Sequence, residues 1–72
     1  MSIVYRSVDF ALSTNAEGEV REGDRLLLDT GRPPREGELA LVRRDGVESL
    51  CRWGAGCGGD VQAVVIGIKR KL

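Results

Sequence analysis

The chain has 72 residues, of which 42% are hydrophobic and 31% are charged, and this balance excludes a disordered protein. Eleven basic and eleven acidic side chains give a formal net charge of zero, which removes any bulk attraction to nucleic acid or to an anionic membrane. We therefore expect one small domain over residues 1–72. Because such a domain buries only about 60% of its unfolded surface, a partner surface would add to its stability.

The sequence also indicates where the protein resides. It contains no apolar run of the ~20 residues that a membrane-spanning helix needs, and its first residues lack the pattern of a secretion signal. We therefore expect a cytoplasmic protein, in which Cys51 and Cys57 are reduced thiols rather than a disulfide. Histidine is absent, which removes the commonest catalytic base and the commonest metal ligand.

The first third of the chain predicts short strands followed by a loop. Residues Ser2–Arg6 and Phe10–Leu12 are β-prone. Residues Ser13–Asp24 are polar and contain two glycines, which is typical of an irregular loop. No window of useful length shows a helical period, so we expect a fold that is all-β or nearly so.

Four strands are predicted in the rest of the chain, and the first two are joined by a turn. Arg25–Thr30 and Leu39–Arg44 are apolar runs of strand length. Between them, Gly31–Glu38 contains two adjacent prolines, which cannot donate hydrogen bonds to a sheet, so it is predicted to be a turn. The dipeptide Asp45-Gly46 then gives a strong hairpin signal.

The last two strands complete an all-β domain. Val47–Trp53 alternates between apolar and polar residues, and we expect Val47, Ser49, Cys51 and Trp53 to face the core. Val61–Arg70 is apolar on both faces, as is typical of a strand that is covered on both sides. Short strands and tight turns predict a small barrel or sandwich of antiparallel strands.

The glycine-rich stretch Cys51–Gly59 contains the spacing G-x-G-x-x-G of a dinucleotide-binding loop. A strand follows it instead of the helix that would hold a pyrophosphate, so we expect no cofactor. Zinc needs four ligands, and one chain supplies only Cys51 and Cys57, which leaves open a site shared across a dimer. Otherwise Cys51 is expected to be a small core side chain beside Trp53, and Cys57 an exposed thiol on a loop.

From Glu22 to the end, the order of features resembles a known family. Gly23-Asp24 precedes an apolar strand that ends in Asp29, a Pro/Arg turn leads through Gly37 into a second strand, and an Asp-Gly hairpin follows. The sequence VVIGIKRKL then closes the chain. This order is similar to the carboxy-terminal domain of LexA-like repressors, a family of self-cleaving serine–lysine peptidases that includes UmuD-like proteins and is related to signal peptidases. The resemblance implies their peptidase fold and a role in transcriptional regulation.

Both catalytic positions of that family are replaced in this chain. The family's nucleophilic serine lies eight residues before the glycine of Gly-Asp, which falls on Asn15, and its general-base lysine falls on Cys51. Asparagine has no nucleophilic atom, and cysteine is not a useful proton acceptor for a serine hydroxyl. The resemblance therefore implies a degenerate site without peptidase activity. Ser13 lies two residues before Asn15, and a shortened loop would bring it to the nucleophile position.

The sequence leaves three functions open. The first is an inactive LexA-like domain that acts as a dimerisation or regulatory module and pairs through its C-terminal strand. The candidate interface residues are Val64, Ile66, Ile68, Arg70 and Leu72.

The second function is a small β-barrel binding module for a peptide or a nucleic acid, at Arg43, Arg44 and the basic tail that begins at Lys69. Nucleic-acid binding by the chain alone is not expected from its net charge. The third function is an active peptidase, either the self-cleaving enzyme of the family or one that uses Cys51 as its nucleophile. The sequence contains no histidine to activate Cys51. The chain is either free-standing or part of a longer one.

Overall fold

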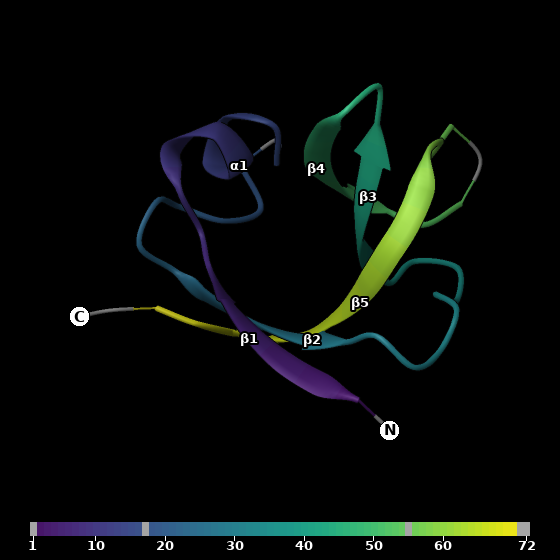
Figure 1. Cartoon of the computed structure of the whole chain (residues 1–72), viewed down its shortest axis with the longest axis horizontal. Coiled ribbons are helices and arrows are strands. Elements are labelled where there is room, and N and C mark those ends of the chain that lie inside the picture. Colours follow the sequence, from purple (N-terminus) through teal and green to yellow (C-terminus); the bar gives the residue numbers. More distant parts are fainter. Residues whose placement is uncertain (1, 17, 55, 71–72) are drawn as a thin grey trace.

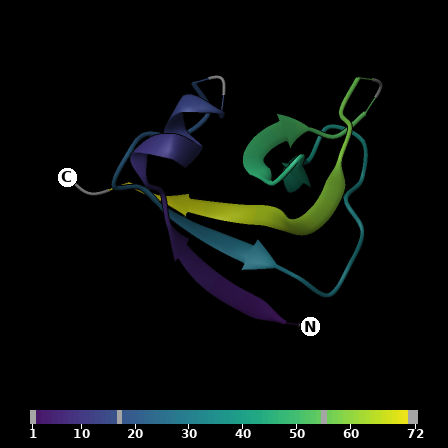
Figure 2. The same ribbon diagram turned by 45° about the horizontal axis from the view of Figure 1, so that its top comes forward.

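The computed structural model describes residues 2–16, 18–54 and 56–70 and shows a mostly β protein. Its elements are β1 (Ile3–Ser7), α1 (Phe10–Thr14), β2 (Arg25–Asp29), β3 (Leu39–Arg44), β4 (Val47–Arg52) and β5 (Asp60–Lys69). The strands form one antiparallel sheet in the order β1-β2-β5-β3-β4. The sheet is strongly curved, and α1 lies beside β4 over its concave side (Figures 1 and 2). The predicted all-β class is confirmed.

The short helix α1 replaces the strand that was expected at residues 10–12. Asp9 caps the helix, because its carboxylate accepts a hydrogen bond from the Leu12 N–H at 2.8 Å. The side chain of Leu12 is 2% exposed and anchors the helix in the core. The strand predicted at Phe10–Leu12 was wrong because a helix of five residues is too short to show a period of 3.6 in the sequence.

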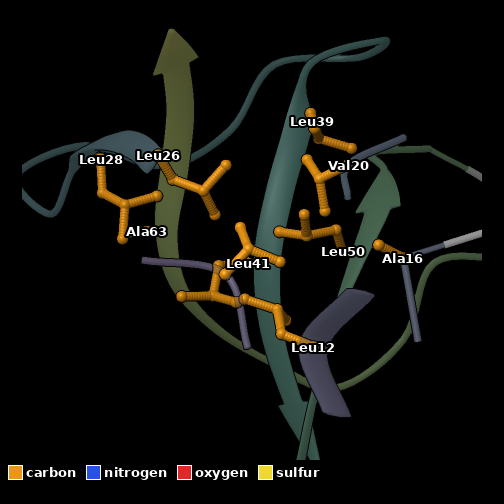
Figure 3. Close-up of a cluster of buried hydrophobic side chains, with 10 residues drawn as sticks. Leu12, Ala16, Val20, Leu26, Leu28, Leu39, Leu41, Leu50 and Ala63 are labelled. Atoms are coloured by element: carbon orange, nitrogen blue, oxygen red, sulfur yellow. The ribbon is translucent and has the colours of Figure 1, made fainter. Parts of the chain in front are cut away.

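A hydrophobic core fills the concave side of the sheet (Figure 3). Its side chains come from the inner face of β2, β3, β4 and β5, from α1, and from the segments before and after that helix. They are Val8, Leu12, Ala16, Val20, Leu26, Leu28, Leu39, Leu41, Leu50 and Ala63. Because burial of a Val or Leu side chain contributes about 1.5–3 kcal/mol, the polar stretch between α1 and β2 is held to the sheet by its own few apolar residues.

The face of β4 that was expected to point inwards is the outer one. Val47 is 51% exposed, whereas Leu50 on the other face is 2% exposed and belongs to the core. Cys51 is half-buried and lies outside the core cluster, so it is not a core side chain. The prediction was wrong because alternation separates two faces without telling which one is covered, and Val47 and Trp53 made the outer face look more apolar.

Although β5 is the last strand in the sequence, it lies at the centre of the sheet. It pairs with β2 on one side and with β3 on the other. The C-terminal strand was expected to pair with a second copy at a sheet edge, and this placement was wrong, because β5 lies between β2 and β3, with Val64–Lys69 paired to β2 and Asp60–Val64 to β3. Among the candidate interface residues, Val64 is fully buried, while Ile66 and Ile68 are 41% and 39% exposed. Leu72 lies outside the described residues.

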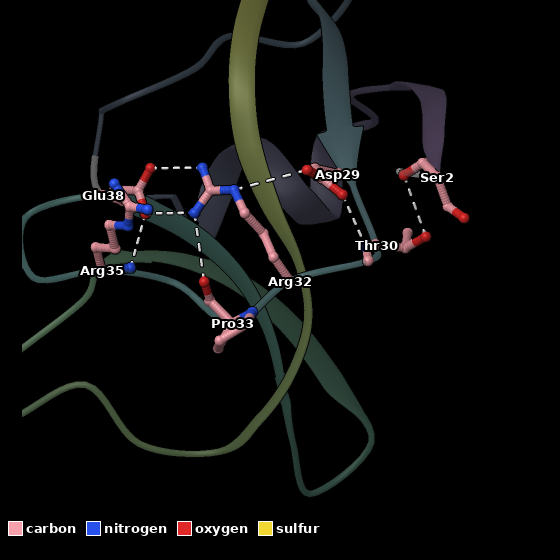
Figure 4. A network of polar contacts seen from close by, with 8 residues as sticks. Ser2, Asp29, Thr30, Arg32, Pro33, Arg35 and Glu38 are labelled. Carbon is pink, nitrogen blue, oxygen red and sulfur yellow. Dashed lines mark hydrogen bonds and ion pairs between the residues drawn. The ribbon is translucent and has the colours of Figure 1, made fainter.

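A polar network orders the turn between β2 and β3 (Figure 4). The Arg32 guanidinium donates to both carboxylate oxygens of Glu38 at 2.7 Å, and the Arg35 N–H donates to one of them at 2.7 Å. The Nε of Arg32 also lies 3.6 Å from the buried carboxylate of Asp29. The hydrogen bonds from Arg32, with that from Arg35, lower the pKa of Glu38 to about 2. These contacts fix the direction in which the chain enters β3.

The two edge strands of the sheet are linked by an ion pair. Arg6 of β1 donates two hydrogen bonds to the carboxylate of Glu48 on β4. These bonds raise the pKa of Arg6 and lower that of Glu48, and both side chains are partly buried. Farther along β4, Arg52 lies 3.0 Å from Glu19 in the segment before β2. The curvature of the sheet thus brings residues from its opposite edges into contact.

Candidate functional site

Asn15, which the resemblance places at the nucleophile position, is the C-terminal cap of α1. Its backbone N–H donates to the Ala11 carbonyl at 3.2 Å, and its side chain is exposed. The next residue, Ala16, is fully buried in the core. The Asp9 cap at one end of the helix and Ala16 at the other therefore set the position of Asn15.

Cys51, at the family's lysine position, lies on the outer face of β4 and forms a disulfide with Cys57. The two Cα atoms are 6.2 Å apart, within the usual range for a disulfide. The expectation of reduced thiols, with Cys57 free on a loop, was wrong because the turn between them folds back. Gly54 and Gly56 have φ values of 152° and 93°, which favour glycine and permit this reversal. In the disulfide form neither sulfur is a thiolate that binds zinc or attacks a substrate.

Asn15 and Cys51 line the same surface cavity, which has a volume of about 520 Å³. One wall comes from the end of α1, a second from β3, β4 and their hairpin, and a third from the glycine-rich turn. The lining residues are Thr14, Asn15, Val42, Arg44, Asp45, Val47, Ser49, Leu50, Cys51, Gly56, Cys57 and Gly58. The fold therefore brings together the two positions that the resemblance singled out.

The chemistry of this cavity does not include a serine–lysine pair. Its hydroxyl groups belong to Thr14, which donates to the Phe10 carbonyl at 2.8 Å, and to Ser49. The guanidinium of Arg44 offers only hydrogen-bond donors, and within the described residues no hydrogen bond joins Ser49 to the Asp45 carboxylate. Lys69 lines a different cavity. The chain's other lysine, at position 71, lies outside the described residues.

Ser13, the alternative nucleophile, does not line this cavity. Its hydroxyl donates to the Phe10 carbonyl at 2.9 Å, inside its own helix. The sequence reasoning missed Thr14, Ser49 and Arg44 as lining residues. Ser49 had a usable signal, because it lies two positions before Cys51 and so projects from the same face of the strand.

The described residues hold no group of three or more His, Cys, Asp or Glu side chains placed to bind a metal ion. In the same ranges, no helix combines the length and the apolar character that crossing a membrane requires. We compared the chain with models of known protein families, with curated proteins and with solved structures, and none of the three comparisons found a match. The assignment to the LexA-like family therefore depends on the residues of this chain and is a proposal.

Proposed function

We propose that the chain is a LexA-like peptidase-fold domain that lacks peptidase activity and acts as an association or regulatory module. The observation that carries this proposal is that Asn15, the C-terminal cap of α1, and Cys51 of β4 line one cavity. Enzymes of the resembling family keep a serine and a lysine at these two positions. Here an amide and a disulfide occupy them, and neither supplies a nucleophile or a base.

The proposed association surface is the strip of apolar side chains on β1. This strand is at the edge of the sheet, and its side chains Ile3, Val4 and Tyr5 are 43%, 45% and 60% exposed. An exposed apolar edge strand invites pairing with a second copy of the chain. We therefore move the proposed homodimer contact to β1, with the exposed Ile66 and Ile68 of β5 contributing side chains rather than backbone.

Restoring the family's residues tests the assignment of the site. If the two positions correspond to its serine and lysine, the double variant Asn15→Ser/Cys51→Lys should react covalently with a fluorophosphonate, because a lysine beside the new hydroxyl accepts its proton. Mass spectrometry of the intact protein measures the adduct. The control Asn15→Ser/Cys51→Ser also loses the disulfide but gains no base, and it should stay unlabelled. A folded double variant without any adduct would argue against the family assignment, and self-cleavage of the wild type at alkaline pH would argue against inactivity.

Sedimentation equilibrium tests the association. At high micromolar concentration the wild type should be a dimer, and Val4→Lys should be a monomer because a charge on an edge strand opposes pairing. Val47→Lys is the matched control, since Val47 is a valine of similar exposure on the other edge strand (51% against 45% for Val4), and it should remain dimeric. A monomeric wild type would rule out the homodimer.

The cytoplasmic location stays a prediction. The disulfide between Cys51 and Cys57 weighs against it, because most thiols in a reducing cytosol are kept unpaired.

A further inference from the structure

A separate surface cavity of about 390 Å³ lies where β1 and β5 end and β2 begins. The end of β5 is the yellow segment on the side of the label C in Figure 1. It is lined by Ser7, Gly23, Arg25, Lys69 and Arg70. Three of these residues form one row across the sheet, because Ser7 pairs with Arg25 and Arg25 pairs with Lys69. Residues that pair directly across strands project from the same face, so a hydroxyl, a guanidinium and an ammonium group lie side by side.

The row places two like charges opposite each other. Arg25 and Lys69 are direct cross-strand partners, an arrangement that destabilises a sheet. Within the described residues, neither of them has a carboxylate in ion-pair contact. No carboxylate in the described ranges therefore offsets the repulsion between the Arg25 and Lys69 side chains.

Arg70 differs, because it lies against the buried carboxylate of Asp24. The Nη2 of Arg70 is 3.2 Å from the Oδ2 of Asp24, and the backbone N–H of Arg21 donates to the same oxygen at 2.9 Å. The hydrogen bond from Arg21, followed by that from Arg70, lowers the pKa of Asp24. Asp24 is therefore ionised and offsets one of the three cations, which leaves the charges of Arg25 and Lys69 uncompensated.

The ammonium group of Lys69 is held near β1. Its Nζ lies 5.8 Å from the centre of the Tyr5 ring, a distance that permits a cation–π contact. Because Tyr5 and Ser7 are two residues apart on the same strand, this contact keeps the ammonium on the side of the Ser7 hydroxyl.

We propose that this cavity binds a phosphate group. A phosphate offers acceptor oxygens to the Ser7 hydroxyl and to the Arg25 and Lys69 cations, and its negative charge offsets the two unpaired positive charges. A small phosphorylated molecule and the backbone of a nucleic acid both present this chemistry. The attraction for phosphate comes from the positive charges of this cavity, since the chain as a whole has a formal net charge of zero.

An NMR titration of the full chain tests the proposal, with inorganic phosphate in one arm and a single-stranded oligonucleotide without terminal phosphates in the other. Both arms are run at constant ionic strength, balanced with chloride. In at least one arm the backbone amides of Ser7, Arg25 and Lys69 should shift and saturate. The variant Arg25→Gln/Lys69→Gln should bind about tenfold more weakly, as expected when charge-assisted hydrogen bonds are lost.

The matched control is Arg43→Gln/Arg44→Gln, which removes the same charge from the β3–β4 hairpin and should change the affinity by less than about twofold. Saturable binding of inorganic phosphate supports a small phosphorylated ligand. Binding only of the oligonucleotide, weakening steeply with added salt, supports a nucleic-acid backbone. If neither probe shifts the three amides, or if both variants lose affinity equally, the proposal is overturned.

Thermal unfolding separates binding from folding. Because Arg25→Gln/Lys69→Gln removes opposed like charges, its Tm in chloride should equal or exceed that of the wild type. A probe that binds should raise the Tm of the wild type and leave that of this variant unchanged. A lower Tm for the variant in chloride would show that the two cations serve stability, and it would overturn the proposal.

Discussion

The carboxylate of Glu38 is ionised down to unusually low pH, because Arg32 and the N–H of Arg35 hydrogen-bond to its charged form and lower its pKa from 4.5 to about 2. A lowered pKa in the folded state means that the charged carboxylate stabilises the fold fully above pH 4.5 and that this stabilisation is lost as the pH falls towards 2. We predict that Glu38→Gln lowers the Tm at neutral pH and that the difference from the wild type disappears by about pH 2.

Thermal unfolding followed by circular dichroism across this pH range measures the effect of Glu38→Gln. Glu36→Gln, which makes the same change of charge in the same turn, is the control and should show no such trend. A pH-independent difference for Glu38→Gln would contradict the role assigned to the Arg32 contact.

Features that depend on single residues were the ones that the sequence predicted well. Asp45 and Gly46 have φ values of 52° and 78°, as a two-residue hairpin turn requires, and the predicted hairpin is confirmed. Counting back from the Gly-Asp pair led to Asn15, and the basic residue Arg52 at the end of the third strand led to Cys51; both positions line one cavity. The pairing of Cys51 with Cys57 was not predicted, because it depends on how the glycine-rich turn folds back and not on residue type.

The positions of most secondary-structure elements were also predictable, but their arrangement was not. β2, β3 and β4 begin at the predicted residues, since each is an apolar run bounded by turn residues. The face of β4 and the place of β5 depend on which neighbours each strand meets in space. Leu50 therefore lies in the core against expectation, and β5 lies between β2 and β3 instead of at an edge.

The turn between β4 and β5 depends on the disulfide for its order. Cys51 and Cys57 are six positions apart, and closing a loop of this length is expected to stabilise the folded state by about 2 kcal/mol. Urea unfolding followed by the fluorescence of Trp53 should show this loss for Cys51→Ser/Cys57→Ser and, to a similar extent, for the wild type in dithiothreitol. The double variant should not respond to the reductant. Equal stability of the wild type with and without dithiothreitol would contradict the prediction.

The molecule as a whole keeps its curvature through contacts between the two edges of the sheet. Arg6 and Glu48 are 30% and 23% exposed and share two hydrogen bonds, so a double-mutant cycle of Arg6→Gln and Glu48→Gln should give a coupling energy of about 1 kcal/mol. The pair of Arg52 and Glu19 is more exposed and should couple by only about 0.3 kcal/mol. Equal coupling energies in the two cycles would mean that the pair between β1 and β4 stabilises the fold no more than an exposed ion pair does.

The central place of β5 has a consequence for how the protein is made. The pairs β1–β2 and β3–β4 share no strand pairing until β5 enters between them, and β5 is synthesised after all four of these strands. Folding during synthesis therefore cannot complete the sheet before Asp60–Lys69 has emerged, and pairing over such sequence distances is slow. Until then, β2 and β3 present open edges to other chains, so the growing protein is most prone to aggregation in the interval before β5 emerges.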